Sequence, residues 1–204
     1  MRLVLDWDGT CTAVDSLHLV LQEFGDSEVF TRVEGQLLAG TISYRDLMEE
    51  EFATVRAPLD DVVSFLLDRA RLRPGFHELA EAHDPLILSS GFRELIEPVL
   101  ARERVELELR ANRIEARPGG WRVRWRDEAA CAVCGDLCKR SGLPEGDVVF
   151  VGDGYSDRCA AGAAMRVFAR DGLAEYLEGD GASFEGFDDF FDVLHALDEP
   201  VSRR

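Results

Sequence analysis

The chain has 204 residues, of which 46% are hydrophobic, and a formal net charge of -17 at pH 7. This size and composition allow a packed domain with a small insertion and argue against wholesale disorder. The negative charge disfavours nucleic acid and anionic membrane surfaces as partners. No apolar run approaches the ~20 residues of a membrane span, and the N-terminal residues predict a strand rather than a signal peptide, so we expect a cytoplasmic protein.

The five cysteines also favour a reducing compartment, because an odd number in a chain of this length is not typical of a disulfide framework. Three of them lie close together in the sequence, at Cys131, Cys134 and Cys138. Structural zinc sites normally have four protein ligands, so we interpret these three as thiols packed on a helix. Zinc binding and a disulfide stay open as alternatives.

The N-terminal residues predict a buried strand that ends in carboxylates. Leu3, Val4 and Leu5 form an apolar run without a polar break, which is typical of a strand buried on both faces. Asp6 and Asp8 follow directly. Ligands of open α/β sheets bind beyond the carboxyl ends of the strands, so these two carboxylates are candidate functional groups.

Residues 16–72 have apolar side chains at helical spacing, and we expect roughly four helices and no strand in this segment. Ser43, with Asp46 three residues later, is predicted to cap one of these helices. We interpret residues 16–72 as a helical cap inserted into a core that is formed by residues 1–15 and 73–204.

After Pro74 the chain alternates between strand and helix patterns. We expect helices at residues 76–83, 92–101, 129–141, 156–164 and 184–197, strands at 86–88, 105–109, 148–151 and 167–169, and a β-hairpin over 113–125. The tail helix is expected to pack its phenylalanines on the sheet. The sequence therefore predicts an α/β fold, a Rossmann-like parallel sheet core with a helical cap inserted after the first strand, plus a β-hairpin.

Polar clusters follow three of the predicted strands: Asp6 and Asp8, Ser89 and Ser90, and Asp153 and Asp157. The carboxyl ends of parallel strands lie at one edge of a sheet, so we expect these clusters to meet. Four carboxylates would repel one another unless a divalent cation held them, and an all-oxygen set favours Mg²⁺. Phosphoryl transfer fits this inventory, because it depends on positioning and on neutralising charge around phosphorus.

Four motifs in this order resemble those of the haloacid dehalogenase superfamily of phosphatases: Asp6-x-Asp8-Gly9-Thr10, Ser89, Lys139 and Gly152-Asp153-Gly154-x-x-Asp157. The helical segment lies between the first and second motifs, as in the phosphoserine phosphatase branch. The run Ser89-Ser90-Gly91-Phe92 also resembles that branch. The cysteines before Lys139 are more similar to the methionine-salvage ketoenol-phosphate phosphatases.

The resemblance implies a role for each motif residue. Asp6 would be the nucleophile that becomes an aspartyl phosphate, and Asp8 would be the general acid and then the general base. Thr10 would fix Asp8 or the phosphoryl group. Ser89 would bind a phosphoryl oxygen, or Ser90 would do so if the register differs by one residue.

The remaining motifs are implied to handle charge. Lys139 would neutralise the phosphate and Asp6. Mg²⁺ would be held by Asp6, the Asp8 carbonyl and Asp153, with Asp157 supporting the metal site or Lys139.

We therefore expect a Mg²⁺-dependent phosphomonoesterase acting on a small phosphorylated metabolite, such as phosphoserine or a methylthio ketoenol phosphate. A phosphoacceptor signalling module and a phosphomutase use the same chemistry and are the alternatives. Asp8 argues against the signalling module, because an acid–base group beside an acyl phosphate would promote its hydrolysis, whereas a signalling module keeps its acyl phosphate for a long time. Asp15, Arg45, Glu49 and Arg56 are candidate cap residues for substrate contact, although each type is usually exposed. The substrate and the oligomeric state stay open.

Overall fold

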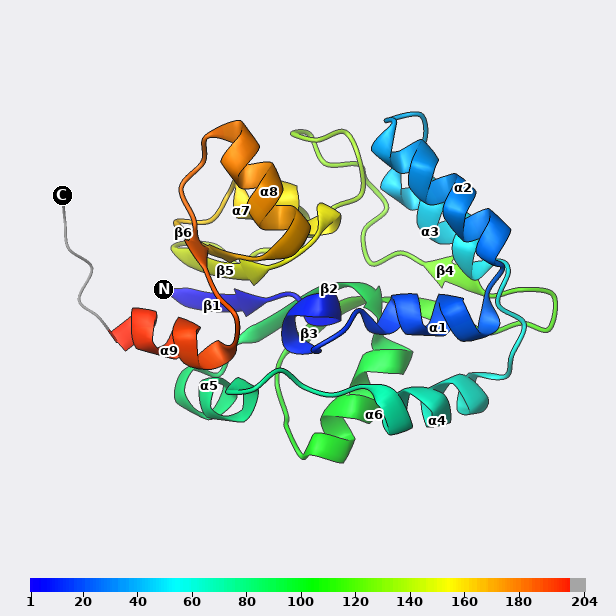
Figure 1. Ribbon diagram of the computed structural model, residues 1–204, viewed down its shortest axis with the longest axis horizontal. Coiled ribbons are helices and arrows are strands. Elements are labelled where there is room, and N and C mark those ends of the chain that lie inside the picture. The colour runs from blue at the N-terminus through cyan, green and yellow to red at the C-terminus, as the bar shows by residue number, and fades with distance from the viewer. Residues whose placement is uncertain (199–204) are drawn as a thin grey trace.

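The computed structural model describes residues 1–198 and is built on one seven-stranded sheet of order β4-β3-β2-β1-β5-β6-β7 (Figure 1). The strands are β1 (Arg2–Leu5), β2 (Leu86–Phe92), β3 (Leu109–Glu115), β4 (Arg122–Arg124), β5 (Val148–Gly152), β6 (Arg166–Ala169) and β7 (Glu185–Gly186). Neighbouring strands are parallel except for β3 and β4. The Rossmann-like parallel sheet predicted from the sequence is confirmed, with β1 near its centre.

Helices cover both faces of the sheet and form a group at one end (Figure 1). They are α1 (Ser16–Phe24), α2 (Ser27–Leu38), α3 (Tyr44–Phe52), α4 (Leu59–Arg69), α5 (Phe76–His83), α6 (Arg93–Glu103), α7 (Arg158–Ala161), α8 (Asp171–Asp180) and α9 (Phe190–Asp198). Residues 1–198 also include three short helical turns: η1 (Trp7–Cys11), η2 (Lys139–Gly142) and η3 (Tyr155–Asp157). None of the helices in residues 1–198 has the length and apolar character needed to cross a bilayer.

Alternation along β1 divides the core into two layers. Leu3 and Leu5 face a cluster that includes Phe76 of α5 and Ile96 of α6. Val4 faces the opposite cluster, which contains the buried residues of α7 and α8. The apolar run at the N-terminus is therefore buried on both faces, as its composition predicted, and this fixes the position of the carboxylates that follow it.

The helical segment between β1 and β2 has an apolar cluster of its own, which also includes Phe92 and Trp121. Ser43 and Asp46 form the predicted capping box at the start of α3. The division into a cap at 16–72 and a core at 1–15 and 73–204 stays a prediction, and residues 199–204 lie outside the described part of the chain.

The predicted helix at 129–141 is wrong. Residues 129–138 form turns and irregular chain, and only Lys139–Gly142 makes a single 3₁₀ turn. The backbone closes on itself here, since the Gly135 N–H donates to the Cys131 carbonyl at 2.8 Å and Gly135 has a φ of +76°. A positive φ in this position ends any helical repeat.

Other boundaries also differ from the prediction. β3 begins where the expected strand at 105–109 ends, and it continues directly into the confirmed hairpin with β4. β2 continues to Phe92 through a shift of register, so the serines lie within it rather than after it. The expected helix at 156–164 is reduced to η3 and α7, and α8 was not predicted.

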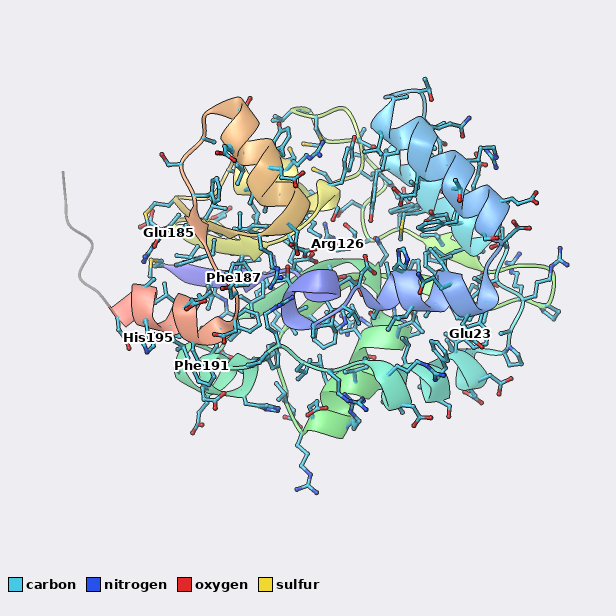
Figure 2. All side chains as sticks on the ribbon, viewed as in Figure 1. Glu23, Arg126, Glu185, Phe187, Phe191 and His195 are labelled. Carbon is cyan, nitrogen blue, oxygen red and sulfur yellow. The ribbon has the colours of Figure 1, made fainter. Side chains whose placement is uncertain are left out.

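The tail packs through only part of its aromatic stripe. Phe187 and Phe190 are buried in the cluster that contains Leu3 and Leu5, whereas Phe191 is 40% exposed (Figure 2). The expectation that Phe191 also packs on the sheet is wrong, because α9 begins only at Phe190 and turns this position outward.

The hairpin fastens the sheet to the end of α3. The Trp121 N–H donates to the carbonyls of Phe52 and Val55 at 3.1 and 3.0 Å. Gly120 has a φ of +126°, and a Cβ at this residue would overlap the carbonyl oxygen of Ala53. Gly119 has open space around it.

We expect Gly120→Ala to lower the free energy of unfolding by roughly 2 kcal/mol or more, because it adds both backbone strain and a clash. Gly119→Ala is the matched control and should stay within about 0.5 kcal/mol of the parent. Urea unfolding followed by circular dichroism measures both values. Equal stability of the two variants would contradict the contact.

Candidate active site

The site begins in the wide turn η1, immediately after β1. The Asp6 carboxylate accepts a hydrogen bond from the Trp7 N–H at 2.6 Å, which fixes its direction at the strand end. Gly9 has a φ of +80°, and a Cβ there would overlap the carboxylate of Asp153. The turn therefore requires glycine for two independent reasons, its conformation and its close approach to Asp153.

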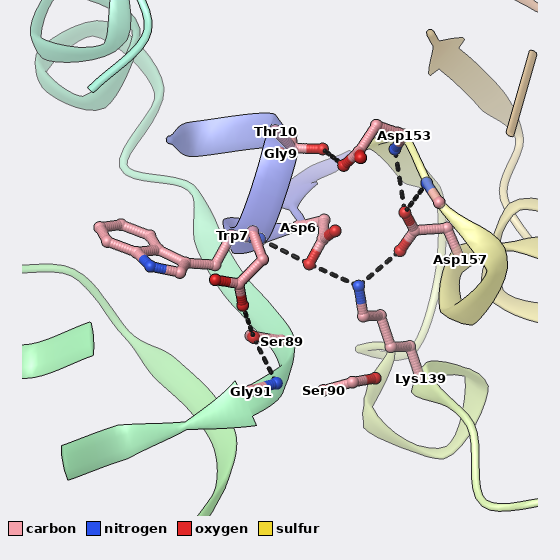
Figure 3. A network of polar contacts seen from close by, with 12 residues as sticks. Asp6, Trp7, Gly9, Thr10, Ser89, Ser90, Gly91, Lys139, Asp153 and Asp157 are labelled. Carbon is pink, nitrogen blue, oxygen red and sulfur yellow. Dashed lines mark hydrogen bonds and ion pairs between the residues drawn. The ribbon is translucent and has the colours of Figure 1, made fainter. Parts of the chain in front are cut away.

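Lys139 is the cation of the site and is buried, with 2% of its side chain exposed. Its Nζ lies 2.5 Å from Asp6 Oδ1 and 2.6 Å from Asp157 Oδ1 (Figure 3). Burial by itself lowers the pKa of Lys139, but the adjacent carboxylates of Asp157 and Asp6 together raise it by more than burial lowers it. The pKa of Lys139 is therefore above its usual value. The ammonium group stays charged and joins two loops of the site.

Asp157 is fully buried and uses both of its oxygens. One oxygen pairs with Lys139, and the other accepts the N–H groups of Asp153 and Gly154, each at 2.9 Å (Figure 3). A Cβ at Gly152 would lie 2.6 Å from this second oxygen. Asp157 therefore shapes the loop after β5 and holds Lys139 in place.

Thr10 connects the two carboxylate loops. Its hydroxyl donates to Asp153 Oδ1 at 2.5 Å, whereas the resemblance implied contact with Asp8 or a phosphoryl group (Figure 3). Arg73 also holds the turn η1. It is buried and donates hydrogen bonds to the carbonyls of Gly9 and Thr10 at 2.5 and 2.8 Å. Arg73 was not predicted as a site residue, because one arginine in a connecting segment has no pattern that separates it from a surface residue.

Asp8 lies in the turn η1, two residues after Asp6. Its carboxylate accepts a hydrogen bond from the Ser16 hydroxyl, and the Ser89 hydroxyl lies 3.4 Å away. Burial, with repulsion from Asp15, raises the pKa of Asp8 to about 7, although the Ser16 hydrogen bond opposes the shift. A carboxyl group with this pKa can both donate and accept a proton near neutral pH.

Ser89 and Ser90 take different positions. The Ser89 hydroxyl accepts the Gly91 N–H at 2.8 Å and faces Asp8 (Figure 3). Ser90 lines the adjoining cavity with Lys139. Gly91 belongs to the run after Ser89 that carries the resemblance, and a Cβ there would lie 2.7 Å from Asp8 Oδ2.

The carboxylates form an oxygen-rich cluster. Asp6, Asp153 and Asp157 each offer an oxygen, and these atoms lie within 4.8 Å of one another. Burial, followed by repulsion from Asp157, raises the pKa of Asp6 well above its usual value and that of Asp153 to about 7. Lys139 compensates only part of this charge. An all-oxygen set with excess negative charge fits Mg²⁺.

A cavity of about 210 Å³ separates these carboxylates from the helices α1 to α3. Its upper wall contains acidic and aromatic side chains, namely Asp15, Phe30, Glu34, Tyr44, Glu51 and Phe52. Among the lining residues that the structure describes, Lys139 is the only lysine or arginine. The part of the wall formed by α1 to α3 therefore carries acidic side chains and no lysine or arginine among the described lining residues.

Glu51 is the unusual member of this wall. It is 3% exposed, and its Oε1 has no hydrogen-bond partner within the described residues. Burial, then repulsion from Glu34, raises the pKa of Glu51 to about 8. Such an oxygen is costly unless a ligand satisfies it. Neither glutamate was predicted, since a single sequence does not show which helical face borders the cavity.

The candidate cap residues named from the sequence divide in two. Asp15 lines the cavity. Arg45 and Glu49 form an exposed ion pair at 2.9 Å, and Arg56 is also exposed.

Comparison with known proteins assigns the family. A model of the haloacid dehalogenase-like hydrolases matches residues 3–162. Pdp3-interacting factor 1 of Schizosaccharomyces pombe is 31% identical over 92% of this chain and 90% of its own length. A 2-hydroxy-3-keto-5-methylthiopentenyl-1-phosphate phosphatase of Exiguobacterium sibiricum is 28% identical over 97% and 96%. The chain therefore belongs to the haloacid dehalogenase-like hydrolase family.

Solved structures agree on the fold. A phospho-aspartyl intermediate analogue of phosphoserine phosphatase superposes with a TM-score of 0.71 at 16% identity, and the match covers 96% of this chain and 97% of that one. A substrate-bound phosphoserine phosphatase complex gives a TM-score of 0.71 at 15% identity over the same shares. The α/β architecture is thus that of these enzymes.

The raised pKa of Asp8 predicts a pH-dependent stability. A carboxyl that titrates near 4 in the unfolded chain and near 7 in the fold destabilises the fold progressively as pH rises between these values. We expect Asp8→Asn to escape this loss and to be more stable than the parent at pH 8, by between roughly 1 and 4 kcal/mol. The advantage should vanish near pH 4.

Thermal and urea unfolding across this pH range, without added divalent cations, measures the difference. Asp68→Asn, an exposed carboxylate on α4, is the control and should follow the parent at every pH. A parent more stable than Asp8→Asn at pH 8 would contradict the expectation.

Proposed function

We propose that this protein is a Mg²⁺-dependent phosphomonoesterase that hydrolyses a small phosphorylated metabolite through an aspartyl phosphate on Asp6. The observation that carries the proposal is the ion-pair chain from Asp6 through Lys139 to Asp157, with Asp8 beside it in the wall of the same cavity. The names of the relatives support phosphatase activity, since several are ketoenol-phosphate phosphatases.

The residues divide the reaction into two steps. In the first, Asp6 attacks phosphorus while Asp8 donates a proton to the leaving oxygen, and Lys139 stabilises the developing negative charge. In the second, Asp8 accepts a proton from the water that attacks the acyl phosphate, which releases phosphate and restores Asp6. The pKa of about 7 suits Asp8 to both directions of proton transfer.

The metal site is proposed from the donor atoms. Asp6, Asp153 and the Asp8 carbonyl would hold Mg²⁺, while Thr10 and Asp157 keep Asp153 in position. When bound, the metal neutralises charge in the site and draws electron density from the phosphoryl group. We also propose the cytoplasm as the compartment, because the five unpaired thiols suit a reducing environment.

The cavity wall favours one class of substrate. Glu51, Glu34 and Asp15 offer acceptor oxygens to the group attached to the phosphate ester, and an ammonium group there would shift Glu51, whose raised pKa favours its neutral form near pH 7, towards its charged form. An amine or ammonium group would satisfy the orphaned Glu51 oxygen, whereas a second anion would find no lysine or arginine besides Lys139 among the described lining residues. We infer that the substrate is a small phosphate monoester that carries a cation and no carboxylate.

Phosphate release from a panel of small monoesters with Mg²⁺ tests the reaction. We expect turnover by the parent and at least a roughly 10³-fold loss in Asp6→Asn, because the amide cannot form the acyl phosphate. Chelation of Mg²⁺ should remove turnover, and its return should restore it. If the parent releases no phosphate but retains a stable phosphate on Asp6 from acetyl phosphate, the phosphatase proposal fails and a signalling role follows.

Phosphoethanolamine and ethyl phosphate test the substrate class, since they differ only in the amine. We expect the parent to prefer phosphoethanolamine. Glu51→Gln should raise the KM for phosphoethanolamine by about 10-fold or more and leave the KM for ethyl phosphate unchanged. Glu49→Gln lies on the same helix outside the cavity and is the matched control. Equal kcat/KM for both esters in the parent would refute the amine subsite while leaving the phosphatase proposal intact.

A further inference from the structure

Four cysteines meet beside the active site. Cys131, Cys134 and Cys138 come from the loop before η2, and Cys159 comes from α7. Their sulfur atoms lie within 4.8 Å of one another. The sequence showed only the first three as a group, and the interpretation of these as thiols packed on a helix is wrong, because their segment is not helical.

The arrangement matches a tetrahedral metal site. Four thiolates around zinc, with bonds of ~2.3 Å, have sulfur–sulfur separations of ~3.8 Å. The Cys131 and Cys159 sulfurs are 3.9 Å apart. A disulfide requires a sulfur–sulfur distance of ~2.05 Å, which is much shorter than this separation.

The loop backbone is folded around the sulfurs. The Cys131 N–H donates to the Asp136 carbonyl at 2.8 Å, and the Val133 N–H points to the Cys131 sulfur at 3.4 Å. An N–H group directed at sulfur stabilises its thiolate form. The tight turn ends at Gly135, where a positive φ is required.

The apolar core contributes nothing to this loop. Val133 is 67% exposed, Cys134 is exposed, and residues 129–138 contain no helix or strand and no member of the apolar core clusters. A segment with so few buried contacts has little to stabilise a single conformation. A bound metal would supply that stability directly, since its binding energy contributes to folding.

We propose that these four cysteines bind one Zn²⁺ in a closed, structural site. Thiolates select zinc over Mg²⁺ or Ca²⁺, and four protein ligands leave no open position for catalysis. On binding, the four thiols lose their protons to solvent and each sulfur donates an electron pair to the metal.

The site would fix the catalytic lysine. Cys138 directly precedes Lys139, and Cys159 lies two residues after Asp157. The metal would therefore clamp the two segments that carry the Lys139–Asp157 ion pair. Its loop also reaches the helical segment, because the Tyr44 N–H donates to Asp136 Oδ2 at 2.6 Å.

Elemental analysis of the full chain, purified under reducing conditions without added metal, tests the proposal. We expect about one zinc per chain in the parent and less than about a fifth of this in Cys134→Ser. Cys11→Ala is the matched control and should retain zinc, since Cys11 is buried elsewhere in the core. Asp6→Asn should also retain zinc, which separates this site from the proposed Mg²⁺ site and from phosphatase activity.

Cobalt gives a second readout on the unmodified protein. Chain produced with Co²⁺ should show the intense visible bands of tetrahedral cobalt together with sulfur-to-metal charge transfer. Parent protein without zinc, with four titratable thiols or a disulfide, would overturn the proposal. Iron in place of zinc, or zinc retained by Cys134→Ser, would overturn it equally.

Discussion

The buried ammonium group of Lys139 is the interaction on which the site depends. It joins Asp6 at the end of β1 to Asp157 after β5, with both contacts at 2.6 Å or less. Removal of one partner would leave an uncompensated buried charge, at a cost of about 3–5 kcal/mol. The same pair of contacts places the candidate nucleophile and the loop of Asp153 on opposite sides of one small volume.

Burial serves the chemistry of the site and weakens the fold at the same time. Desolvation raises the pKa of Asp8 and Asp153 to about 7, because the interior disfavours their charged forms, and ionising them above this pH destabilises the fold. The close packing of these carboxylates against the backbone also explains the positions of three glycines. Gly9, Gly91 and Gly152 each let a carboxylate approach the backbone more closely than a Cβ would permit.

The loop before η2 connects the three parts of the molecule that must act together. It delivers Lys139 to the sheet edge, presents Asp136 to the start of α3, and brings three cysteines to Cys159. Tyr44 also stacks on Tyr155 of η3, with ring centroids 6.1 Å apart. The helical wall and the carboxylate end of the cavity are thus tied through one segment that has almost no core of its own.

The sequence by itself determined the parallel sheet, the helical segment after β1 and the candidate site, because buried strands leave apolar runs and their ends leave adjacent polar residues such as Asp6 and Asp8. Such patterns bring together residues that follow the ends of parallel strands, but they do not show which loop or helix residues contact one another. Only the tertiary structure brought Cys159 to the other cysteines, placed Arg73 under the turn η1 and turned Glu51 into the cavity. These contacts depend on how distant segments pack together and on which face of a helix borders the cavity. Neither is visible in the sequence pattern.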